Sequence, residues 1–391
     1  MNKRDCLWLM KILSVGCGNI GSVAAEDLSK SRIHDEVIVA DYDKTRAEAV
    51  AEKIGTDNVS PMQLDATKPD VLQRTLEKYD AVMGFLPGNL GFRLMEACIT
   101  AGVGLVDVSF MAEDPLRLDK RAAEAGVTII PDCGLAPGIS NLLVGHAVSE
   151  LNEVKAVHIM VGGLPEKPVP PLGYVITWSP ESLIDEYTRK AGIVRNGKCV
   201  RVEALTGLET IDFPGVGELE AFWTDGLRTL MSTVKANDMW EKTLRYCGHA
   251  EKIKAFEQLG FFDEKEIDVE GVRVSPRKLT VELLGQRLRK PGVKDIVVLS
   301  VEVAGVRSQK KTCYSYRLLD CYDKKRQVTA MARTTAYPAS IITQFMLEGA
   351  IKERGIIPLE KTGMNKDVFE KFMSELEKRG VNVSEKKRHP K

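Results

Sequence analysis

The sequence predicts an α/β fold, with a doubly wound parallel sheet in its first third and a second, α+β domain after it. In the first 130 residues, short apolar runs alternate with amphipathic helical patterns, which is typical of parallel strands joined by crossover helices. A glycine-rich turn follows the first apolar run. From residue 153 onward, longer β-type segments replace the regular alternation, which indicates a change of domain.

The elements of the first region can be placed in order. The expected strands cover 11–15, 36–40, 59–63, 80–85, 104–108 and 127–130. The expected helices between them cover 19–30, 44–54, 68–77, 90–101 and 115–125. Right-handed crossovers would place helices on both faces of this sheet. We therefore expect one domain over residues 1–135, a second over 136–335, and C-terminal helices over 336–391 that return to the first.

The second region mixes both kinds of structure. Asn196-Gly197 between two β-type runs predicts a type I′ hairpin. Further β segments are expected at 201–213, 218–223, 294–304, 311–321 and 326–333. Helices are expected at 182–190, 225–235, 250–259 and 276–287, then from Pro338 to Gly355 and over 366–379. The basic tail from Ser384 is expected to lack structure.

The glycine-rich turn carries the first functional prediction. Gly16, Gly18 and Gly21 have the spacing G-x-G-x-x-G, with Asn19 and Ile20 opening a helix. The first glycine permits a tight turn, the second a close approach to a pyrophosphate, and the third close packing of helix on strand. The helix N-terminus presents N–H groups to the anion. With a strand on each side, this predicts a Rossmann-type dinucleotide site.

An acidic residue predicts the choice of dinucleotide. Asp41 ends the second strand, twenty residues after Gly21. A carboxylate there can accept hydrogen bonds from the adenosine ribose and repel a 2′-phosphate. The sequence therefore favours NAD over NADP as the cofactor.

Loops that follow the other strands lie at the same edge of such a sheet. Asp65-Ala66 could approach the adenine, or Asp65 could cap the next helix. Leu86-Pro87 follows the fourth strand, near the expected nicotinamide ribose, or forms a plain turn. Asp107 ends the fifth strand and is a candidate for contact with both cofactor and substrate.

Composition excludes several classes of partner. Lysine plus arginine and aspartate plus glutamate both number 55, so no net charge favours nucleic acid or an anionic membrane. The eight cysteines include no C-x-x-C pair, which favours a reducing cytoplasm, and the five histidines have no metal-ligand spacing. No run is long enough to cross a membrane. The opening residues run into the first strand without a leader cleavage site, and either Met1 or Met10 could be the natural start.

Several stretches beyond the glycine turn resemble the saccharopine dehydrogenase (reductase) family. They are Cys133-Gly-Leu-Ala-Pro-Gly138, Gly162-Gly-Leu-Pro165, Thr177-Trp-Ser179, Thr224-Asp-Gly-Leu-Arg228, Thr243-Leu-Arg-Tyr246 with Gly248, and Ala332-Arg-Thr-Thr-Ala-Tyr-Pro338. Within the family, the sequence is most similar to the members that oxidise lysine at carbon 6. The stretches that carry this similarity are 178–187, 219–228 and 240–252.

The resemblance implies an NAD-dependent oxidation of the ε-amine of L-lysine to an aldehyde that cyclises. Such a reaction needs an anchor for the α-carboxylate and a base for the amine proton. Arg228 and Arg245 are the candidate anchors, with an internal ion pair to Asp225 or Glu241 as the alternative. Asp107 and His249 are the candidate bases, with helix or turn capping as the alternative.

Three further residues complete the candidate substrate site. Trp178 could wall the pocket or belong to the core, and Asp225 could contact substrate as well as pair with an arginine. Glu181 stands where saccharopine-binding members tend to carry an arginine, which favours a cationic substrate, unless it only serves the helix dipole. The other readings are an NADP-dependent saccharopine reductase or carboxynorspermidine dehydrogenase, and a non-catalytic NAD-binding protein. A homodimer with sheets meeting edge to edge is expected.

Overall fold

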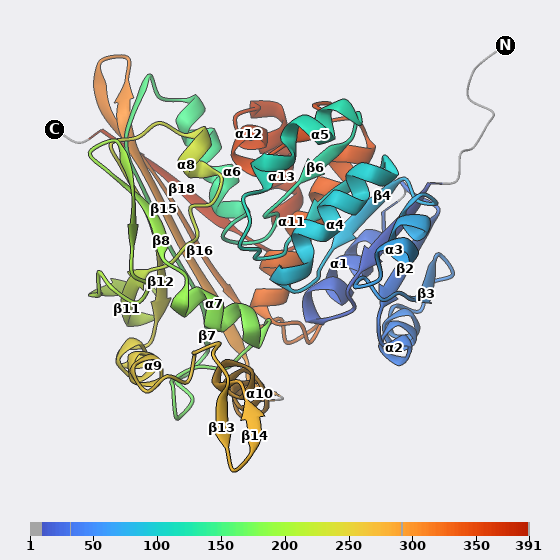
Figure 1. Ribbon diagram of the computed structural model, residues 1–391. Helices are drawn as coiled ribbons and strands as arrows, with labels where there is room; N and C mark the ends of the chain where they lie inside the picture. Colours follow the sequence, from blue (N-terminus) through green and yellow to red (C-terminus); the bar gives the residue numbers. More distant parts are fainter. Residues whose placement is uncertain (1–9, 32, 291, 390–391) are drawn as a thin grey trace. The chain divides into compact units, whose positions relative to one another are not determined.

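The computed structural model describes residues 10–31, 33–290 and 292–389, and its chain forms two compact units (Figure 1). The residues before Met10, including Met1, lie outside the described part. Unit 1 holds the described residues up to Ile139, with Thr335–Thr362 and Asp367–Arg379. Unit 2 holds Ser140–Thr334, Gly363–Lys366 and the described residues from Gly380.

Unit 1 is built on a parallel sheet. Its described strands are β1 (Lys11–Val15), β2 (Glu36–Asp41), β3 (Val59–Gln63), β4 (Ala81–Gly84), β5 (Gly104–Asp107), β6 (Thr128–Ile130) and β17 (Gly355–Ile356). They lie in the order β17-β6-β5-β4-β1-β2-β3. The order turns outward in both directions from β1; β1 is buried except at its first residue, and β4 is buried throughout. This confirms the doubly wound fold class.

The helices of unit 1 connect these strands. They are α1 (Asn19–Ser29), α2 (Lys44–Ile54), α3 (Pro69–Leu76), α4 (Gly88–Ala101), a 3₁₀ turn (Pro115–Leu118) and α5 (Asp119–Glu124). Local chemistry fixes their ends: Asp43 caps α2 by accepting the N–H of Thr45 at 3.0 Å, and Gly55 ends the helix in a left-handed conformation. The expected helices in this region are all present, within two residues at either end.

The strand register gathers the strand ends at one edge. Val15 lies opposite Ala40 on one side and Gly84 on the other, and Gly84 lies opposite Asp107. The segments that leave β1, β2, β4 and β5 therefore start side by side, which is where ligands bind in such sheets.

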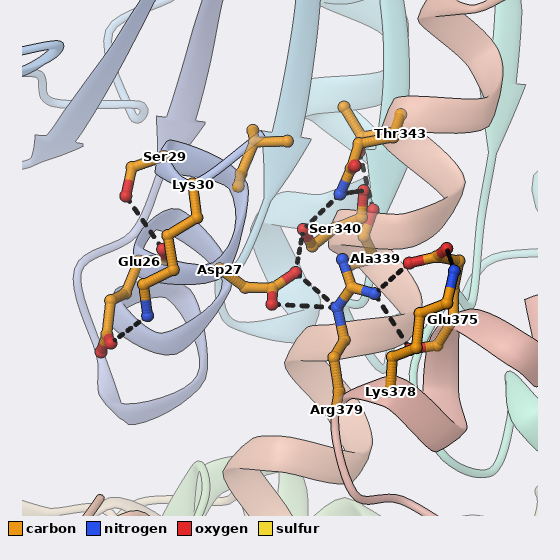
Figure 2. Close-up of polar contacts among 12 residues, drawn as sticks. Glu26, Asp27, Ser29, Lys30, Ala339, Ser340, Thr343, Glu375, Lys378 and Arg379 are labelled. Atoms are coloured by element: carbon orange, nitrogen blue, oxygen red, sulfur yellow. Dashed lines mark hydrogen bonds and ion pairs between the residues drawn. The ribbon is translucent and has the colours of Figure 1, made fainter. Parts of the chain in front are cut away.

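The C-terminal part of unit 1 is fastened to the glycine-turn helix by a charge cluster (Figure 2). The helices of this C-terminal part are α11 (Ala330–Leu347) and α13 (Lys366–Lys378), with the short α12 (Leu359–Gly363) between them. The Nε of Arg379, one residue past α13, lies 2.9 Å from both carboxylate oxygens of Asp27 in α1. The hydroxyl of Ser340 in α11 donates to the same carboxylate at 2.7 Å, and Glu375 pairs with Arg379 at 2.6 Å. Segments more than 300 residues apart in sequence thus hold α1 in place.

Unit 2 is built on one large mixed sheet and a separate small hairpin. The order of its main path is β10-β11-β12-β7-β15-β16-β18, with β8 and β9 attached through β12. The strands are β7 (Glu153–Pro165), β8 (Ala191–Arg195), β9 (Lys198–Val202), β10 (Glu209–Phe213), β11 (Gly217–Trp223), β12 (Asp238–Arg245), β15 (Asp295–Arg307), β16 (Lys310–Cys321) and β18 (Val383–Arg388). The hairpin pairs β13 (Ile267–Val269) with β14 (Val272–Val274).

Five helices join the strands in the described part of unit 2. They are α6 (Ile139–Ser149), α7 (Pro180–Thr188), α8 (Leu230–Thr233), α9 (His249–Gln258) and α10 (Pro276–Leu288). The expected Asn196-Gly197 hairpin is confirmed, since φ is positive at both residues (50° and 73°) and β8 pairs with β9. No described helix has the length and apolar character that a membrane crossing requires.

Three expectations about helices and strands in this region are wrong. The helix expected at 225–235 shrinks to α8, because Arg228 has a left-handed φ of 52°. The β segment expected at 326–333 gives way to α11, which starts at Ala330 because Asp295 accepts its N–H at 2.7 Å. Pro338, expected to open that helix, lies inside it.

The tail and the centre of the sheet also differ from expectation. Residues from Val383 form β18, which pairs with β16 instead of lacking structure. The central strand β12, between β11 and β7, was not expected from the sequence at all. β18 pairs with β16, and β12 pairs with β7 as well as with the nearby β11. The pairings with β16 and β7 join distant parts of the chain, and the local pattern does not indicate them.

The Asp27–Arg379 pair predicts a specific loss of stability. Both side chains are nearly buried, at 13% and 14% exposed. Arg379→Ala would leave Asp27 charged without its main cation, so we expect the free energy of unfolding to fall by roughly 3 kcal/mol in urea denaturation.

Lys378→Ala is the matched control. Lys378 is the neighbouring residue, is 66% exposed, and pairs with the same Glu375. We expect its removal to cost less than about 0.5 kcal/mol. Equal losses for the two variants would contradict a special role for the Asp27–Arg379 pair.

Candidate active site

The glycine turn after β1 has the geometry of a dinucleotide cradle. Gly16 has φ of 104°, and a Cβ there would lie 2.6 Å from the carbonyl oxygen of Phe85. A Cβ on Gly21 would overlap the carbonyl oxygen of Gly16, so α1 can approach the turn only with glycine at that position. A Cβ on Gly18 would meet no atom of the described structure within 4 Å. Two of the glycines are therefore needed for packing, and Gly18 faces open space.

The N-terminus of α1 is open to an anion. Within the described residues, no side chain caps this helix at Gly18. Gly18 and Asn19 are exposed and Ile20 is half-buried. Because first-turn N–H groups lack partners inside a helix, they can receive a pyrophosphate here. The cradle therefore fits a dinucleotide.

Asp41 lies at the end of β2, and its carboxylate is already engaged. The side chain is 5% exposed. Oδ2 accepts the N–H of Cys17 at 2.8 Å, and Oδ1 accepts the N–H of Asp43 at 3.0 Å. Arg46 lies 3.6 Å from Oδ1. Asp41 thus ties the glycine turn to the adjacent strand end, where a ribose would lie.

The thiol of Cys17 in this turn is unreactive. Burial, followed by the charge of Asp41, raises its pKa to about 12. It therefore remains a neutral thiol over the whole physiological range.

The loops after β3 and β4 are turns with ordinary local bonds. Asp65 accepts both the N–H and the hydroxyl of Thr67, at 3.0 and 2.6 Å, and the hydroxyl bond is the main cause that lowers the pKa of Asp65. Ala66 and Leu86 are half-buried and pack against the core of unit 1. Pro87 is exposed at the start of α4. The bonds of Asp65 are those of a turn, and its remaining exposure leaves room for a ligand contact.

Asp107 is the most buried of the predicted site residues. Its side chain is 0% exposed, and it accepts the N–H of Ser109 at 2.8 Å and the hydroxyl of Ser109 at 3.1 Å. A Cβ on Gly84 in the neighbouring strand would overlap the Asp107 carboxylate, so glycine makes space for the acid. Burial, with the charges of Asp107 and Asp132, raises the pKa of the Cys133 thiol well above its usual value. Asp107 therefore stands as an acid at the ligand edge, beside an inert thiol.

In unit 2 a polar cluster surrounds the end of β12. Arg245 is 3% exposed and its Nη2 lies 2.9 Å from Glu186 Oε2 in α7. Its guanidinium also lies 4.6 Å from the centre of the Tyr174 ring. The other oxygen of Glu186 accepts the hydroxyl of Thr243 at 2.6 Å. Burial is the largest single influence and lowers the pKa of Arg245, but Glu186, Tyr187 and Tyr174 together outweigh it and raise that pKa.

His249 joins this cluster as a neutral imidazole. Its Nδ1 lies 2.9 Å from the carbonyl oxygen of Leu172, so Nδ1 must carry the proton. Its Nε2 then accepts the hydroxyl of Tyr187 at 2.8 Å. Burial, followed by the charge of Arg245, lowers the pKa of His249 to about 3. These contacts suit His249 to holding Tyr187, and they do not favour a general base near neutral pH.

The remaining predicted residues are spread over unit 2. Asp225 accepts the N–H of Gly192 at 3.1 Å and pairs with Arg201 at 3.0 Å, which is a structural role at a strand end. Arg228 follows in the same loop and is half-buried. Trp178 donates its indole N–H to the Tyr174 hydroxyl at 3.0 Å and so borders the cluster.

Glu181 lies apart from that cluster. It is exposed in the first turn of α7, whose Ser179 cap accepts the N–H of Ser182 at 3.3 Å. Glu181 and Glu186 are five residues apart, which places them on different faces of the helix. The exposed first-turn position favours the helix-dipole role.

The structure thus brings together three residues that the sequence predicted separately, Arg245, His249 and Trp178. The residues that connect them were not predicted. These are Glu186, Tyr187 and Tyr174. Glu186 and Tyr187 end the stretch 178–187 on which the resemblance was based, and a carboxylate there was the available signal. Among the described residues, no set of three His, Cys, Asp or Glu side chains could hold a metal ion.

Substitutions at Gly18, which faces open space, and at Gly21, which packs against the turn, should have different effects. Gly18→Val has room for its side chain, so the fold should survive while the pyrophosphate loses its place. We expect no measurable dinucleotide binding by isothermal titration, with an unchanged melting temperature. Gly21→Ala forces the helix away from the turn and should lower the melting temperature as well. Near-wild-type affinity in Gly18→Val would refute the role of the turn.

The buried neutral His249 predicts a pH-dependent stability. Its pKa is about 3 when folded against 6.5 when unfolded, so the unfolded chain binds the proton first as pH falls. Proton binding to His249 in the unfolded chain therefore lowers the free energy of unfolding by about 2 kcal/mol between pH 7 and pH 5. His249→Asn keeps a donor for Leu172 but lacks the titration. In urea denaturation, we expect the difference in free energy of unfolding between wild type and variant to be about 2 kcal/mol smaller at pH 5 than at pH 7. An equal difference at both pH values would mean that the pKa of His249 is the same in the folded and unfolded protein.

Comparison with known proteins gives these two regions a family. Residues 12–130 match the model of the saccharopine dehydrogenase NADP binding domain, and residues 134–381 match the saccharopine dehydrogenase C-terminal domain. The chain is 26% identical to the mitochondrial alpha-aminoadipic semialdehyde synthase of Mus musculus, over 76% of this chain but only 34% of that protein. It is thus similar to about a third of that longer protein.

Shorter relatives match over nearly their whole length. The saccharopine dehydrogenase [NADP(+), L-glutamate-forming] of Pyricularia oryzae is 22% identical, over 96% of this chain and 98% of its own. The solved apo saccharopine dehydrogenase (L-Glu forming) of Saccharomyces cerevisiae shares the fold, with a TM-score of 0.78 at 21% identity over 97% of this chain and 100% of that chain. Together with the family models, which cover most of the sequence, these findings show that the chain belongs to the saccharopine dehydrogenase family of oxidoreductases.

Proposed function

We propose that this family member is an L-lysine 6-dehydrogenase, which oxidises the ε-amine of L-lysine with NAD. The product would be the 6-semialdehyde, which cyclises onto its own α-amine. The observation that carries this proposal is the buried Arg245–Glu186 pair at the end of β12.

The pair offers one cation and one anion, which match the two ends of an amino-acid zwitterion. The Arg245 fork can hold an α-carboxylate by two parallel hydrogen bonds. Glu186 can accept an α-ammonium. Each group of the substrate would replace a partner that is already charged, so neither protein charge is left buried alone.

The same charge balance favours lysine over saccharopine. Lysine brings one carboxylate to the site, whereas saccharopine brings two more. Those would require additional cations around a cluster in which Glu186 already balances Arg245. Tyr174 and Trp178 supply aromatic surface for an aliphatic chain.

The protein side chains have separate tasks in this reaction. Bound NAD would accept the hydride. Asp107, held by both the N–H and the hydroxyl of Ser109, is the candidate to take the proton from the ε-ammonium before hydride loss. His249 fixes the Tyr187 hydroxyl, which in turn lies 3.4 Å from Arg245 Nε and orients the guanidinium. The assignment of Asp41 to the ribose hydroxyls supports NAD.

A direct assay tests the proposal. Purified protein is mixed with NAD and L-lysine, and NADH absorbance is followed, with saccharopine and with buffer as parallel samples. We expect NADH from lysine alone. Absence of lysine turnover, with dinucleotide binding intact, would contradict the proposed substrate.

The role proposed for Glu186 leads to a prediction for the KM of lysine. Glu186→Gln keeps the shape but removes the anion beside Arg245, so the α-ammonium loses its partner. We expect the KM for lysine to rise by about tenfold or more. Glu181→Gln is the matched control on the exposed turn of the same helix, and its KM should stay within about twofold of wild type. If Glu181→Gln impairs lysine turnover more than Glu186→Gln does, then the substrate is bound at Glu181.

A second candidate function is favoured by the names of the relatives. Reductive formation of saccharopine with NADPH, or the analogous carboxynorspermidine reaction, would agree with a relative named for NADP(+) and L-glutamate. It predicts NADPH consumption with an aldehyde and an amino-acid amine, and no NADH from lysine. A homodimer in a reducing compartment completes our proposal, and the described cysteines are all free thiols.

A further inference from the structure

The exposed apolar side chains of this protein are concentrated in one segment of unit 2. Of the thirteen large apolar side chains that are exposed in the described residues, seven lie within residues 259–283. Apolar residues scattered singly are normal on a protein surface, whereas a group of them marks an interaction site. The concentration therefore indicates a surface that binds a partner.

The hairpin of β13 and β14 presents an apolar face within this segment. Ile267 pairs with Val274, and Val269 pairs with Val272. Directly paired residues of a hairpin point to the same side, so these four side chains share one face. Ile267, Val269 and Val272 are 52%, 48% and 62% exposed. This face is thus largely open to solvent in a single copy of the chain.

Neighbouring strands do not support the hairpin. Among the described strands, β13 and β14 pair only with each other, and each is three residues long. Figure 1 shows the hairpin beside α10, with its turn pointing away from the large sheet of unit 2. A two-stranded hairpin is marginally stable in water by itself, and packing of its apolar face against another surface stabilises it.

The helix that follows the hairpin has an exposed apolar stripe as well, formed by Leu279 and Leu283. These residues are one turn apart in α10 and are 47% and 43% exposed. Leu284 and Leu288, on another side of the helix, are buried in a core cluster of unit 2. Within the described residues, α10 is therefore apolar on two sides, and only one of them is covered.

The charges of this segment are segregated, which makes the segment complementary to itself. Residues 263–270, which include β13, hold five acidic side chains and one lysine. Residues 273–290, which include β14 and α10, hold six cationic side chains and one acid. A two-fold interface brings the same surface of two copies together, so the acidic part of each copy can face the cationic part of the other. The acidic part would instead repel a nucleic acid or an anionic membrane.

We propose that the β13–β14 hairpin and the exposed stripe of α10 form a two-fold interface between two copies of this chain. The apolar faces of the two hairpins pack against each other, and residues 263–270 of each copy face residues 273–290 of the other. In this arrangement the two large sheets do not meet edge to edge. The proposal rests on the homodimer of the proposed function and names the surface through which it forms, and it does not depend on lysine as the substrate.

Sedimentation velocity of the full chain over a dilution series tests the apolar face. Ile267→Asp places a carboxylate in that face in both copies, and the exposed position should keep the fold. Leu208→Asp is the matched control, because Leu208 is also 52% exposed and lies in unit 2 outside the segment. We expect Ile267→Asp to raise the dimer dissociation constant by about thirtyfold or more, and Leu208→Asp to leave it within about twofold of wild type. The melting temperature of each variant checks that its fold is kept.

Charge reversal tests the arrangement independently of the apolar face. One variant carries Glu264→Lys and Glu266→Lys, and the other carries Lys278→Glu and Arg287→Glu, all at exposed positions. Each variant alone loses attraction at both symmetry-related contacts, so its homodimer should be weakened. A mixture of the two variants restores opposite charges at both contacts. We expect the mixed dimer to be at least about tenfold tighter than either variant homodimer.

The results separate this interface from the rest of the proposed function. A wild-type dimer that is unchanged by Ile267→Asp, or variants that show no preference for each other, would refute the interface and leave the homodimer standing. A wild type that remains monomeric throughout the dilution series would refute the interface together with the homodimer. Failure of lysine oxidation in the enzyme assay would leave the sedimentation results, and therefore this inference, unaffected.

Discussion

The close approach of α1 to the turn after β1 is the constraint on which unit 1 depends. A side chain on Gly21 would overlap the carbonyl oxygen of Gly16, and one on Gly16 would meet the backbone of Phe85. With glycine at both positions, the helix N-terminus comes to the edge of the sheet, where its N–H groups face open space at Gly18. Asp41 then fastens the same turn to β2 through the N–H of Cys17. The cradle is thus shaped by backbone packing, before any ligand binds.

Long-range contacts keep that helix in position. Asp27, in the same α1, is held by Arg379 and Ser340 from the last part of unit 1 (Figure 2). The glycine turn sets the direction of the helix, and the charge cluster fixes its far side against α11 and α13. A helix supported on both sides loses little entropy when it binds an anion, because its N–H groups are already oriented.

The sequence predicted unit 1 well because the information there is local. Apolar runs, helix caps and the glycine spacing lie within about thirty residues of each other, and the strands and helices expected in the first 130 residues formed where they were expected. The short β17 and α12, which the chain adds to unit 1 much later, were not expected. Unit 2 was less predictable because its signals lie far apart. Asp295 starts α11 from 35 residues away, and β18 forms only through pairing with β16. The partner of Arg245 was likewise missed, since Glu186 lies 59 residues earlier and on a helix. The local sequence pattern indicates which charged residues are unusual for their position, but it does not indicate which of them form ion pairs in the fold.

That balance of charges is what the two candidate sites have in common. Arg245 is compensated by Glu186 in unit 2, and Asp41 by Arg46 in unit 1. A bare buried charge would destabilise the fold, so each site keeps an internal partner while no ligand is bound. A ligand must then offer a group that replaces this partner, and ligands of the wrong charge leave one member of the pair unsatisfied. Under the proposed function, specificity would therefore follow from the exchange of partners within a neutral pair: a zwitterion would complete the exchange at Arg245–Glu186, whereas an extra carboxylate would find no cation released for it.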